Sequence, residues 1–96
     1  MLVRSELFDE VGGVDTAFAR DFNDVDFCLR VRAQGKRVAW TPYAHFTHHE
    51  GASIQRRKSD PAEGKMFSER WSQEYAVDPY YSPALNQDLA RIYEAL

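Results

Sequence analysis

The sequence predicts a small α/β domain, and three observations lead to that expectation. Apolar residues recur at helical spacing in several segments, and two short segments between them have the β-prone or alternating composition of strands. The length of 96 residues, of which 44% are hydrophobic, is enough for one core. We therefore expect three to four helices with two or three short strands. The expected helices cover residues 5–11, 24–34, 61–75 and 85–96, and the expected strands cover residues 37–41 and 44–48.

Composition and charge exclude several classes of protein. No apolar run reaches the roughly 20 residues that span a bilayer, and the first residues lack the charged and then apolar organisation of a signal peptide. Because Cys28 is the only cysteine, no intrachain disulfide can form, and a cytoplasmic setting is expected. The formal charge of −3 gives no general attraction to nucleic acid, so we expect no nucleic-acid partner.

Capping signals bound the first and third expected helices. Ser5 could cap the first helix, and the pair Gly12–Gly13 ends it. Asp60 is a cap candidate for the third helix, Pro61 suits the first helical position, and Glu63 stands three residues beyond the cap. The third helix should therefore begin at Pro61 and continue to about residue 75.

The second expected helix has an acidic start. Asn23 can accept a hydrogen bond from the N–H of Asp26 while the Asp26 carboxylate reaches back, which is a relative of the capping box. Gly35 stands where a left-handed C-cap belongs. The spacing predicts that one side of this helix packs in the core and that two further apolar residues widen this side. The residues on that side are Val25, Cys28, Leu29 and Arg32, widened by Phe27 and Val31.

Short strands are expected between the second and third helices. Residues 37–41 are β-prone and are followed by Pro42, which cannot donate to a sheet ladder. Residues 44–48 alternate between apolar and polar side chains, as a strand does. Further along, aromatic residues at intervals of four make a stripe on the third helix that must pack against another part of the chain. These are Phe67, Trp71 and Tyr75.

Two carboxylates at the start of the second helix are the first candidates for chemistry. Free N–H groups and the positive end of the helix dipole stabilise the ionised form of Asp24 and Asp26. The plain interpretation is structural, because acids are common in the first turn of a helix: Asp26 is a capping partner and Asp24 a first-turn acid. From the residues alone, this interpretation is favoured.

A histidine segment and a basic segment follow. His45, His48 and His49 occupy the end of the second expected strand and the loop after it, where neutral imidazole could bind a divalent metal, although spacing alone defines no metal site. Cys28 has no partner in a zinc pattern and is expected in the core. The basic pair Arg56–Arg57 is either a solvated loop or a clamp for phosphate.

Three stretches in this order resemble a known family. They are "LFDEVGGVDTAF" at residues 7–18, "FNDVDFCLRVRAQGKRVAWTPYAHFTHHEGAS" at 22–53 and "DPYYSPAL" at 78–85. Together they resemble the C-terminal half of the catalytic domain of family 2 glycosyltransferases, most of all bacterial enzymes of the rhamnan, O-antigen or capsule type. The resemblance covers roughly residues 4–85. It implies the nucleotide-sugar fold called GT-A and an inverting transfer of sugar to a saccharide hydroxyl.

The resemblance also implies roles for residues at the acidic helix. Asp24 matches the general base that deprotonates the acceptor hydroxyl, and Asp26 matches a second acid in support. Asn23 occupies the position where the family usually has glutamate, which is a departure from the pattern. Gly13 and Asp15 would help to shape the acceptor side.

Other roles implied by the resemblance concern the donor. His48 matches the family's histidine that binds a divalent metal, Mg or Mn, in the complete enzyme, and His49 and Glu50 are neighbouring second choices. Arg56 and Arg57 would contact the donor diphosphate. The partners implied are a nucleotide-sugar donor and a saccharide acceptor, in a cytoplasmic protein that the full-length chain could place at the inner face of the membrane.

The nucleotide-binding half of that family has no counterpart in these residues. We therefore expect residues 1–96 to be a single-domain fragment, the acceptor-side half of a catalytic domain with a helical extension at about 61–96. Alone, the fragment should be inactive and could form homo-oligomers through exposed apolar surface. The principal alternative is a small α/β interaction module without enzymatic activity. A weaker alternative is a metal-dependent hydrolase that uses His48, His49 and the aspartates.

Overall fold

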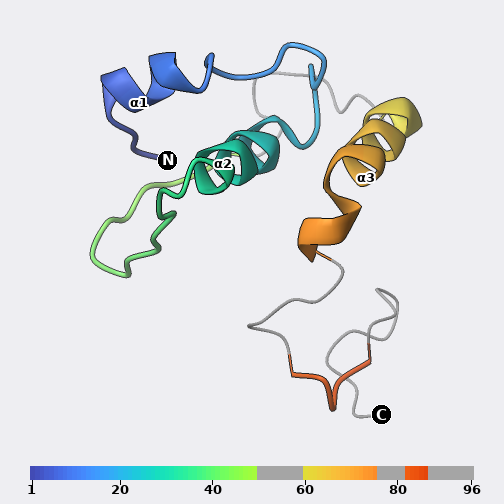
Figure 1. Ribbon diagram of the computed structural model, residues 1–96. Helices are drawn as coiled ribbons and strands as arrows, with labels where there is room; N and C mark the ends of the chain where they lie inside the picture. The colour runs from blue at the N-terminus through green and yellow to red at the C-terminus, as the bar shows by residue number, and fades with distance from the viewer. Residues whose placement is uncertain (50–59, 76–81, 87–96) are drawn as a thin grey trace.

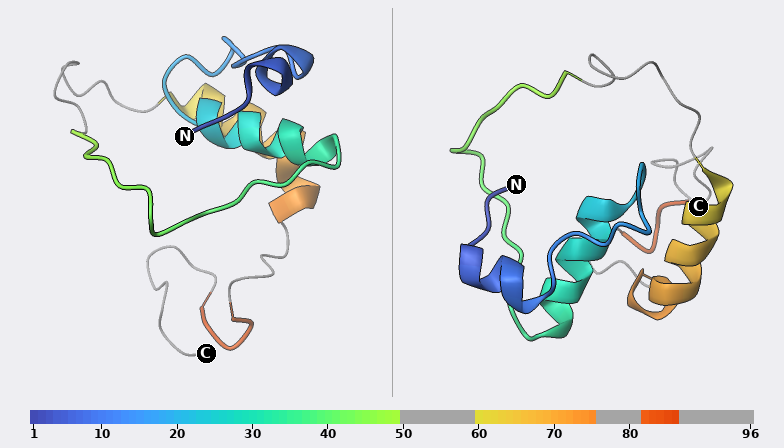
Figure 2. Two further views of the ribbon diagram at one scale, coloured as in Figure 1. Left: turned by 90° about the vertical axis from the view of Figure 1, so that its left-hand side faces the viewer. Right: turned by 90° about the horizontal axis from the view of Figure 1, so that it is seen from above.

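Three helices form the described part of the protein. The computed structural model describes residues 1–49, 60–75 and 82–86. Its helices are α1 (Ser5–Glu10), α2 (Asn23–Ala33) and α3 (Pro61–Tyr75), and α2 lies between the other two (Figures 1 and 2). No helix within the described residues is long and apolar enough to cross a membrane. Most of the helix expected at 85–96 lies outside the described residues.

Helix α1 ends as expected but begins differently. Arg4, not Ser5, is its N-cap, and no side chain caps it. Gly12 and Gly13 follow the helix with φ of 79° and 68°, a backbone conformation that favours glycine. The Gly13 N–H donates to the carbonyl of Phe8 at 2.8 Å, and this bond closes the turn. The chain is thereby turned back toward α2.

The capping box expected at the start of α2 is not formed. The N-cap is Phe22, which is left-handed at φ 66° and has no side-chain cap bond. The side chain of Asn23 instead donates to the carbonyl of Phe18 at 3.3 Å, and the carboxylate of Asp26 faces other partners. At the far end the expected glycine cap is confirmed, because Gly35 has φ 73° and its N–H donates to the carbonyl of Arg32 at 2.8 Å.

The buried side of α2 matches the expected one only in part: Phe27 and Val31, which were expected to widen it, are buried, but its expected centre is not. Asp26, Phe27 and Val31 are buried, and the ring of Phe27 packs 5.5 Å from that of Phe8 between centroids. The side expected in the core lines an open groove of about 1180 Å³ between α1, α2 and the segment that follows α2. The expected residues that line this groove are Val25, Cys28, Leu29 and Arg32. Helix α2 therefore has a second apolar side that the described residues leave open.

Helix α3 has the predicted bounds and part of the predicted cap. The Asp60 carboxylate accepts from the Ala62 N–H at 2.9 Å, but Glu63 does not reach back to the cap. Its aromatic stripe packs as expected: Trp71 is buried, and the ring of Phe67 stacks on Phe22 at 4.7 Å between centroids. The side chain of Tyr75 lies outside the described part.

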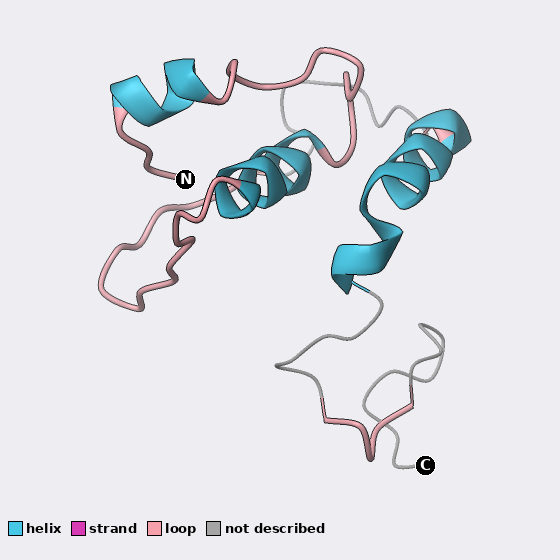
Figure 3. Ribbon diagram, in the orientation of Figure 1, coloured by secondary structure: helices cyan, strands magenta, loops and turns pink. Residues whose placement is uncertain are grey.

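The expected strands at 37–41 and 44–48 are absent, and the described residues contain no strand (Figure 3). Residues 36–49 have exposed side chains and form an extended segment. It first passes beside α2, where residues 36–39 line the groove, and then leaves the helices (Figures 1 and 2). Among them Trp40 is 85%, Tyr43 93% and Phe46 79% exposed. A strand is held by a ladder of hydrogen bonds to a neighbour, and no described residue supplies that neighbour. The GT-A fold itself remains a prediction.

Candidate functional site at the acidic end of helix α2

Asp26 is the centre of a buried hydrogen-bond network between α2 and α3. Its side chain has no exposed surface. One carboxylate oxygen, Oδ2, accepts from Arg30 Nε at 2.8 Å. The other, Oδ1, accepts from Trp71 Nε1 at 2.8 Å and from an Arg70 nitrogen at 2.9 Å. Two cations and an indole N–H thus compensate the cost of burying this charge.

Arg30 connects the same network to the glycine turn after α1. Beyond its bond to Asp26, its two terminal nitrogens donate to the carbonyl of Val11 at 2.6 Å and to that of Gly13 at 2.7 Å. Its guanidinium lies 5.7 Å from the centroid of the Phe27 ring. Gly13 was expected on the acceptor side, and the structure places its carbonyl in the network that Asp26 organises.

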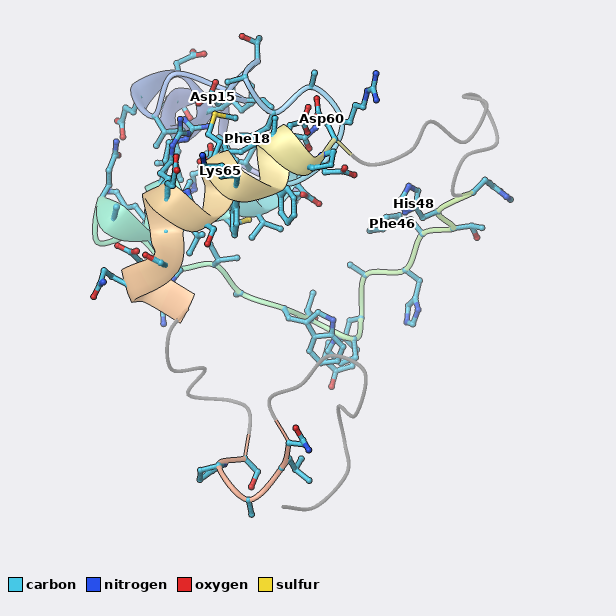
Figure 4. All side chains as sticks on the ribbon, turned by 90° about the vertical axis from the view of Figure 1, so that its right-hand side faces the viewer. Asp15, Phe18, Phe46, His48, Asp60 and Lys65 are labelled. Carbon is cyan, nitrogen blue, oxygen red and sulfur yellow. The ribbon has the colours of Figure 1, made fainter. Side chains whose placement is uncertain are left out.

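Asp15 joins the network from the loop between α1 and α2. Its Oδ2 accepts from Arg70 at 2.7 Å, and its Oδ1 accepts from the Ala17 N–H at 2.9 Å. Figure 4 shows Asp15 and Phe18 beside α3. The structure therefore brings together three of the predicted acceptor-side and catalytic residues, which are Gly13, Asp15 and Asp26.

The network shifts the pKa values of its carboxylates. Burial alone would raise the pKa of Asp26, but the hydrogen bonds from Trp71, Arg30 and Arg70 outweigh burial and lower it. The pKa of Asp15 is lowered by the backbone N–H of Ala17 and by Arg70. Both carboxylates are therefore ionised at neutral pH.

Glu63 is a second buried acid, and it binds backbone rather than cations. It is 6% exposed. Its Oε1 accepts from the Ala19 N–H at 3.1 Å, and its Oε2 accepts from the N–H groups of Arg20 at 3.2 Å and Asp21 at 2.7 Å. Three consecutive amides thus converge on one carboxylate, which holds the loop before α2 against α3.

Asp24 has a different environment from Asp26, although only Val25 separates them in the chain. Its side chain is exposed, and Oδ1 accepts from the Val25 N–H at 2.9 Å. The expected general base is therefore accessible, whereas the expected supporting acid is enclosed by protein groups. Asn23 is half-buried, and its amide bonds to the loop carbonyl of Phe18.

The predicted metal and donor residues are not assembled in this structure. His45, His48 and His49 are exposed, and Figure 4 shows His48 on the extended segment, apart from the helices. Within the described ranges no group of three or more His, Cys, Asp or Glu side chains could hold a metal ion. Arg56 and Arg57, with Glu50, lie outside those ranges.

Cys28 is half-buried and not fully in the core as expected. Its Sγ lies 3.8 Å from the Met1 sulfur, on the side of α2 that lines the groove. Burial, followed by the nearby charge of Asp24, raises the pKa of the thiol, so it is neutral at physiological pH.

Sequence reasoning missed Arg70 and the partners of Glu63 and Trp71. Glu63, Phe67, Arg70 and Trp71 recur at intervals of four, three and one, so they share one face of α3. That pattern was visible in the sequence as an apolar stripe containing charged residues. Their partners are 42 to 55 residues away in the chain, and no local signal identifies partners at such distances.

Comparisons with known proteins place a related segment in two much longer proteins. The chain is 36% identical over 92 residues to "Uncharacterized protein y4gI" of Sinorhizobium fredii, a match covering 88% of this chain and 10% of that protein. It is 35% identical over 94 residues to "O-antigen biosynthesis protein RfbC" of Myxococcus xanthus, covering 88% of this chain and 7% of that protein. No family model and no solved structure matches. The chain thus spans a tenth or less of the curated relatives it matches.

Proposed function

We propose that this chain is the acceptor-side part of an inverting glycosyltransferase of family 2 that acts in cell-surface polysaccharide synthesis. The order of the three quoted stretches supports this, and so does similarity to a segment of a protein whose name assigns it to O-antigen biosynthesis. The observation that carries the proposal is the contrast between Asp24 and Asp26. One carboxylate is open to a substrate, and the other is engaged on both oxygens.

In the proposed reaction Asp24 is the general base. A sugar hydroxyl is a weak nucleophile until a carboxylate takes its proton. As Asp24 accepts that proton, the hydroxyl oxygen forms a bond to the anomeric carbon of the donor, and the bond from that carbon to the diphosphate oxygen breaks with its electrons. The diphosphate leaves with one additional negative charge. A single displacement of this kind inverts the anomeric centre.

The described residues do not by themselves make a metal site. Among them His48 is the proposed ligand, with His49 as a second choice, and both are exposed. A divalent ion usually takes several oxygen or nitrogen ligands. The proposed role of His48 therefore requires further ligands from elsewhere in a longer protein.

Exposed apolar surface supports the proposal that the chain belongs to a larger catalytic domain. Trp40, Tyr43 and Phe46 are each more than three-quarters exposed, and Val25 on the open side of α2 is 46% exposed. Large apolar side chains left this exposed are suited to a contact with other protein. The same surface is the observation that favours the second candidate, a non-enzymatic interaction module.

An assay of the full-length polypeptide that contains this chain distinguishes the two candidates. The polypeptide is incubated with a panel of nucleotide-sugar donors and saccharide acceptors, and transferred sugar is measured. We expect transfer, and we expect Asp24→Asn to lower kcat by about 10²- to 10⁴-fold, the usual contribution of a general base. Asp9→Asn, an exposed acid on α1, is the matched control and should leave kcat unchanged. Transfer that survives Asp24→Asn refutes the base, and no transfer with any donor favours the interaction module.

A further inference from the structure

One face of α3 contacts the loop that leads into the acidic helix, at Asp15 and along residues 18–22. We name this face, made of Glu63, Phe67, Arg70 and Trp71, the brace face. Glu63 binds the backbone at 19–21, and Phe67 packs against the rings at both ends of that stretch, Phe18 at 6.2 Å and Phe22 at 4.7 Å between centroids. The path of the loop is therefore set by contacts to a helix that lies some forty residues later in the chain.

Arg70 is the residue of the brace face that joins the loop to α2. One of its nitrogens donates to Asp15 at 2.7 Å and to Asp26 at 2.9 Å, and its guanidinium lies 5.0 Å from the centroid of the Phe18 ring. Asp15 begins the loop, and Asp26 lies in the first turn of α2. A single cation thus fixes the separation of two carboxylates that would otherwise repel each other.

The position of Asp26 determines the position of Asp24. Both lie in the first turn of α2, so a rotation or shift of that turn moves both together. The only described bond of the Asp24 carboxylate is to the adjacent Val25 N–H, which turns with the helix and cannot hold it against the rest of the protein. Its orientation relative to the loop is therefore set through Asp26, by way of Arg70 and Trp71.

We propose that Arg70 is a positioning residue for the transfer reaction, which orients the Asp24 carboxylate toward the acceptor by clamping Asp15 to Asp26. This inference rests on the proposed function. A misplacement of reacting groups by about 1 Å can cost about 100-fold in rate. Arg70 therefore acts through the two carboxylates and the loop they hold, and does not itself touch the reacting atoms.

Arg70 is a better test of positioning than its neighbours. Its side chain is 35% exposed, so its pair with Asp15 is partly screened by water. Asp26 keeps its bonds to Arg30 and Trp71 when Arg70 is replaced. Trp71 and Glu63 are buried, and their loss would disturb folding itself. Arg70→Met keeps an unbranched apolar side chain and removes the cation, whereas Arg70→Lys keeps a cation at this position.

The first experiment uses the 96-residue chain and its ¹⁵N–¹H spectra. In Arg70→Met the indole N–H of Trp71 should keep a dispersed resonance, because its bond to Asp26 remains. Amide exchange in the loop 15–22 should accelerate by at least about tenfold, and the Val25 amide, which donates to Asp24, should shift. Lys65→Met, on an exposed side of α3, is the control and should change neither. Unchanged loop exchange in Arg70→Met refutes the clamp.

The second experiment measures kinetics in the full-length polypeptide. Arg70→Met should lower kcat about 10- to 100-fold with the KM for the donor unchanged, and Arg70→Lys should recover most of that loss. The melting temperature is measured alongside, so that a folding defect is recognised. If Arg70→Met retains kcat within twofold while Asp24→Asn is inactive, positioning by Arg70 is wrong and the proposed function stands. If Asp24→Asn is also fully active, the proposed function fails and the inference fails with it.

Discussion

Asp24 and Asp26 show how two identical side chains in one helical turn acquire opposite properties. The helix dipole acts on both, but Asp26 faces Arg30, Arg70 and Trp71 whereas Asp24 faces solvent. The difference therefore comes from tertiary partners. A carboxylate held on both oxygens by protein groups is suited to fix structure, and an exposed one is free to take a proton from a substrate.

The contrast predicts that the same substitution has a large effect on stability at Asp26 and a small one at Asp24. Asp26→Asn should lower the free energy of unfolding by about 3 kcal/mol, because it leaves two partly buried arginines facing a neutral group. Asp24→Asn should change it by less than about 0.5 kcal/mol, as is usual at exposed positions. Urea unfolding followed by circular dichroism measures both. Equal effects of the two substitutions would show that Asp26 is not the centre of the network.

The lowered pKa of Asp26 predicts a loss of stability in acid. Hydrogen bonds to the ionised form hold the folded-state pKa below the ordinary value of 3.8, so the contribution is complete above that value and is lost as pH falls through the folded-state pKa. The free energy of unfolding should be nearly constant from about pH 7 to about pH 5 and fall below about pH 4. Urea titrations at several pH values test this, and the fall should be smaller in Asp26→Asn.

At the scale of elements, α3 is attached to the rest of the protein mainly by polar contacts. Glu63 binds three backbone N–H groups, and Arg70 and Trp71 bind Asp26. Buried apolar side chains are few, namely Phe18, Phe27, Val31 and Trp71 in the described residues. The docking of α3 therefore depends on the satisfaction of each buried polar group.

Removal of the Glu63 charge should loosen α3. Glu63→Gln keeps the shape but replaces one acceptor oxygen by a donor that faces backbone N–H groups, at a cost of about 1–3 kcal/mol. Glu69→Gln is the matched control on the same helix, because Glu69 is exposed and pairs only weakly with Lys65 at 3.8 Å. Hydrogen exchange of the amides at 19–21 should accelerate in Glu63→Gln alone. Equal exchange in both variants would contradict this role of Glu63.

The helices show which features the sequence could predict. The bounds of α3 and the glycine ends of α1 and α2 followed from local signals, since capping and left-handed turns depend on residues a few positions apart. The burial of Phe27 and Val31 was also predicted, but that of Asp26 was not, because Asp26 is stabilised there by Arg70 and Trp71, 44 and 45 residues away. An acid that finds such partners is buried in preference to the apolar Val25. Asp24 is exposed, and its role as a general base stays a prediction.

At the scale of the whole molecule, the expected strands are absent because they too depend on a partner that the local sequence does not reveal. Residues 37–41 and 44–48 have strand-like sequences, but strand formation requires a neighbour that the described residues do not provide. The β-prone composition is therefore present without the pairing. Exposed aromatic side chains on this segment are the physical consequence.

The exposed aromatic segment predicts self-association of the isolated chain. The weight-average mass should rise with concentration in sedimentation or light scattering. The double variant Trp40→Ser with Phe46→Ser should weaken association by at least about tenfold, since each buried aromatic side chain contributes more than 1.4 kcal/mol. Leu2→Ser removes an equally exposed apolar residue outside the segment and should have no effect. A chain that remains monomeric at all concentrations would show that this surface does not associate.

The two tryptophans differ in environment, so intrinsic fluorescence can report the position of α3. Trp71 is buried with its indole bonded to a carboxylate, and Trp40 is in water. Replacing Trp40 by phenylalanine leaves Trp71 as the single tryptophan, and its emission maximum and accessibility to a quencher depend on whether α3 is packed against α2. Intrinsic fluorescence could then follow the packing of α3 against α2 in real time, without a label, while a candidate substrate is added.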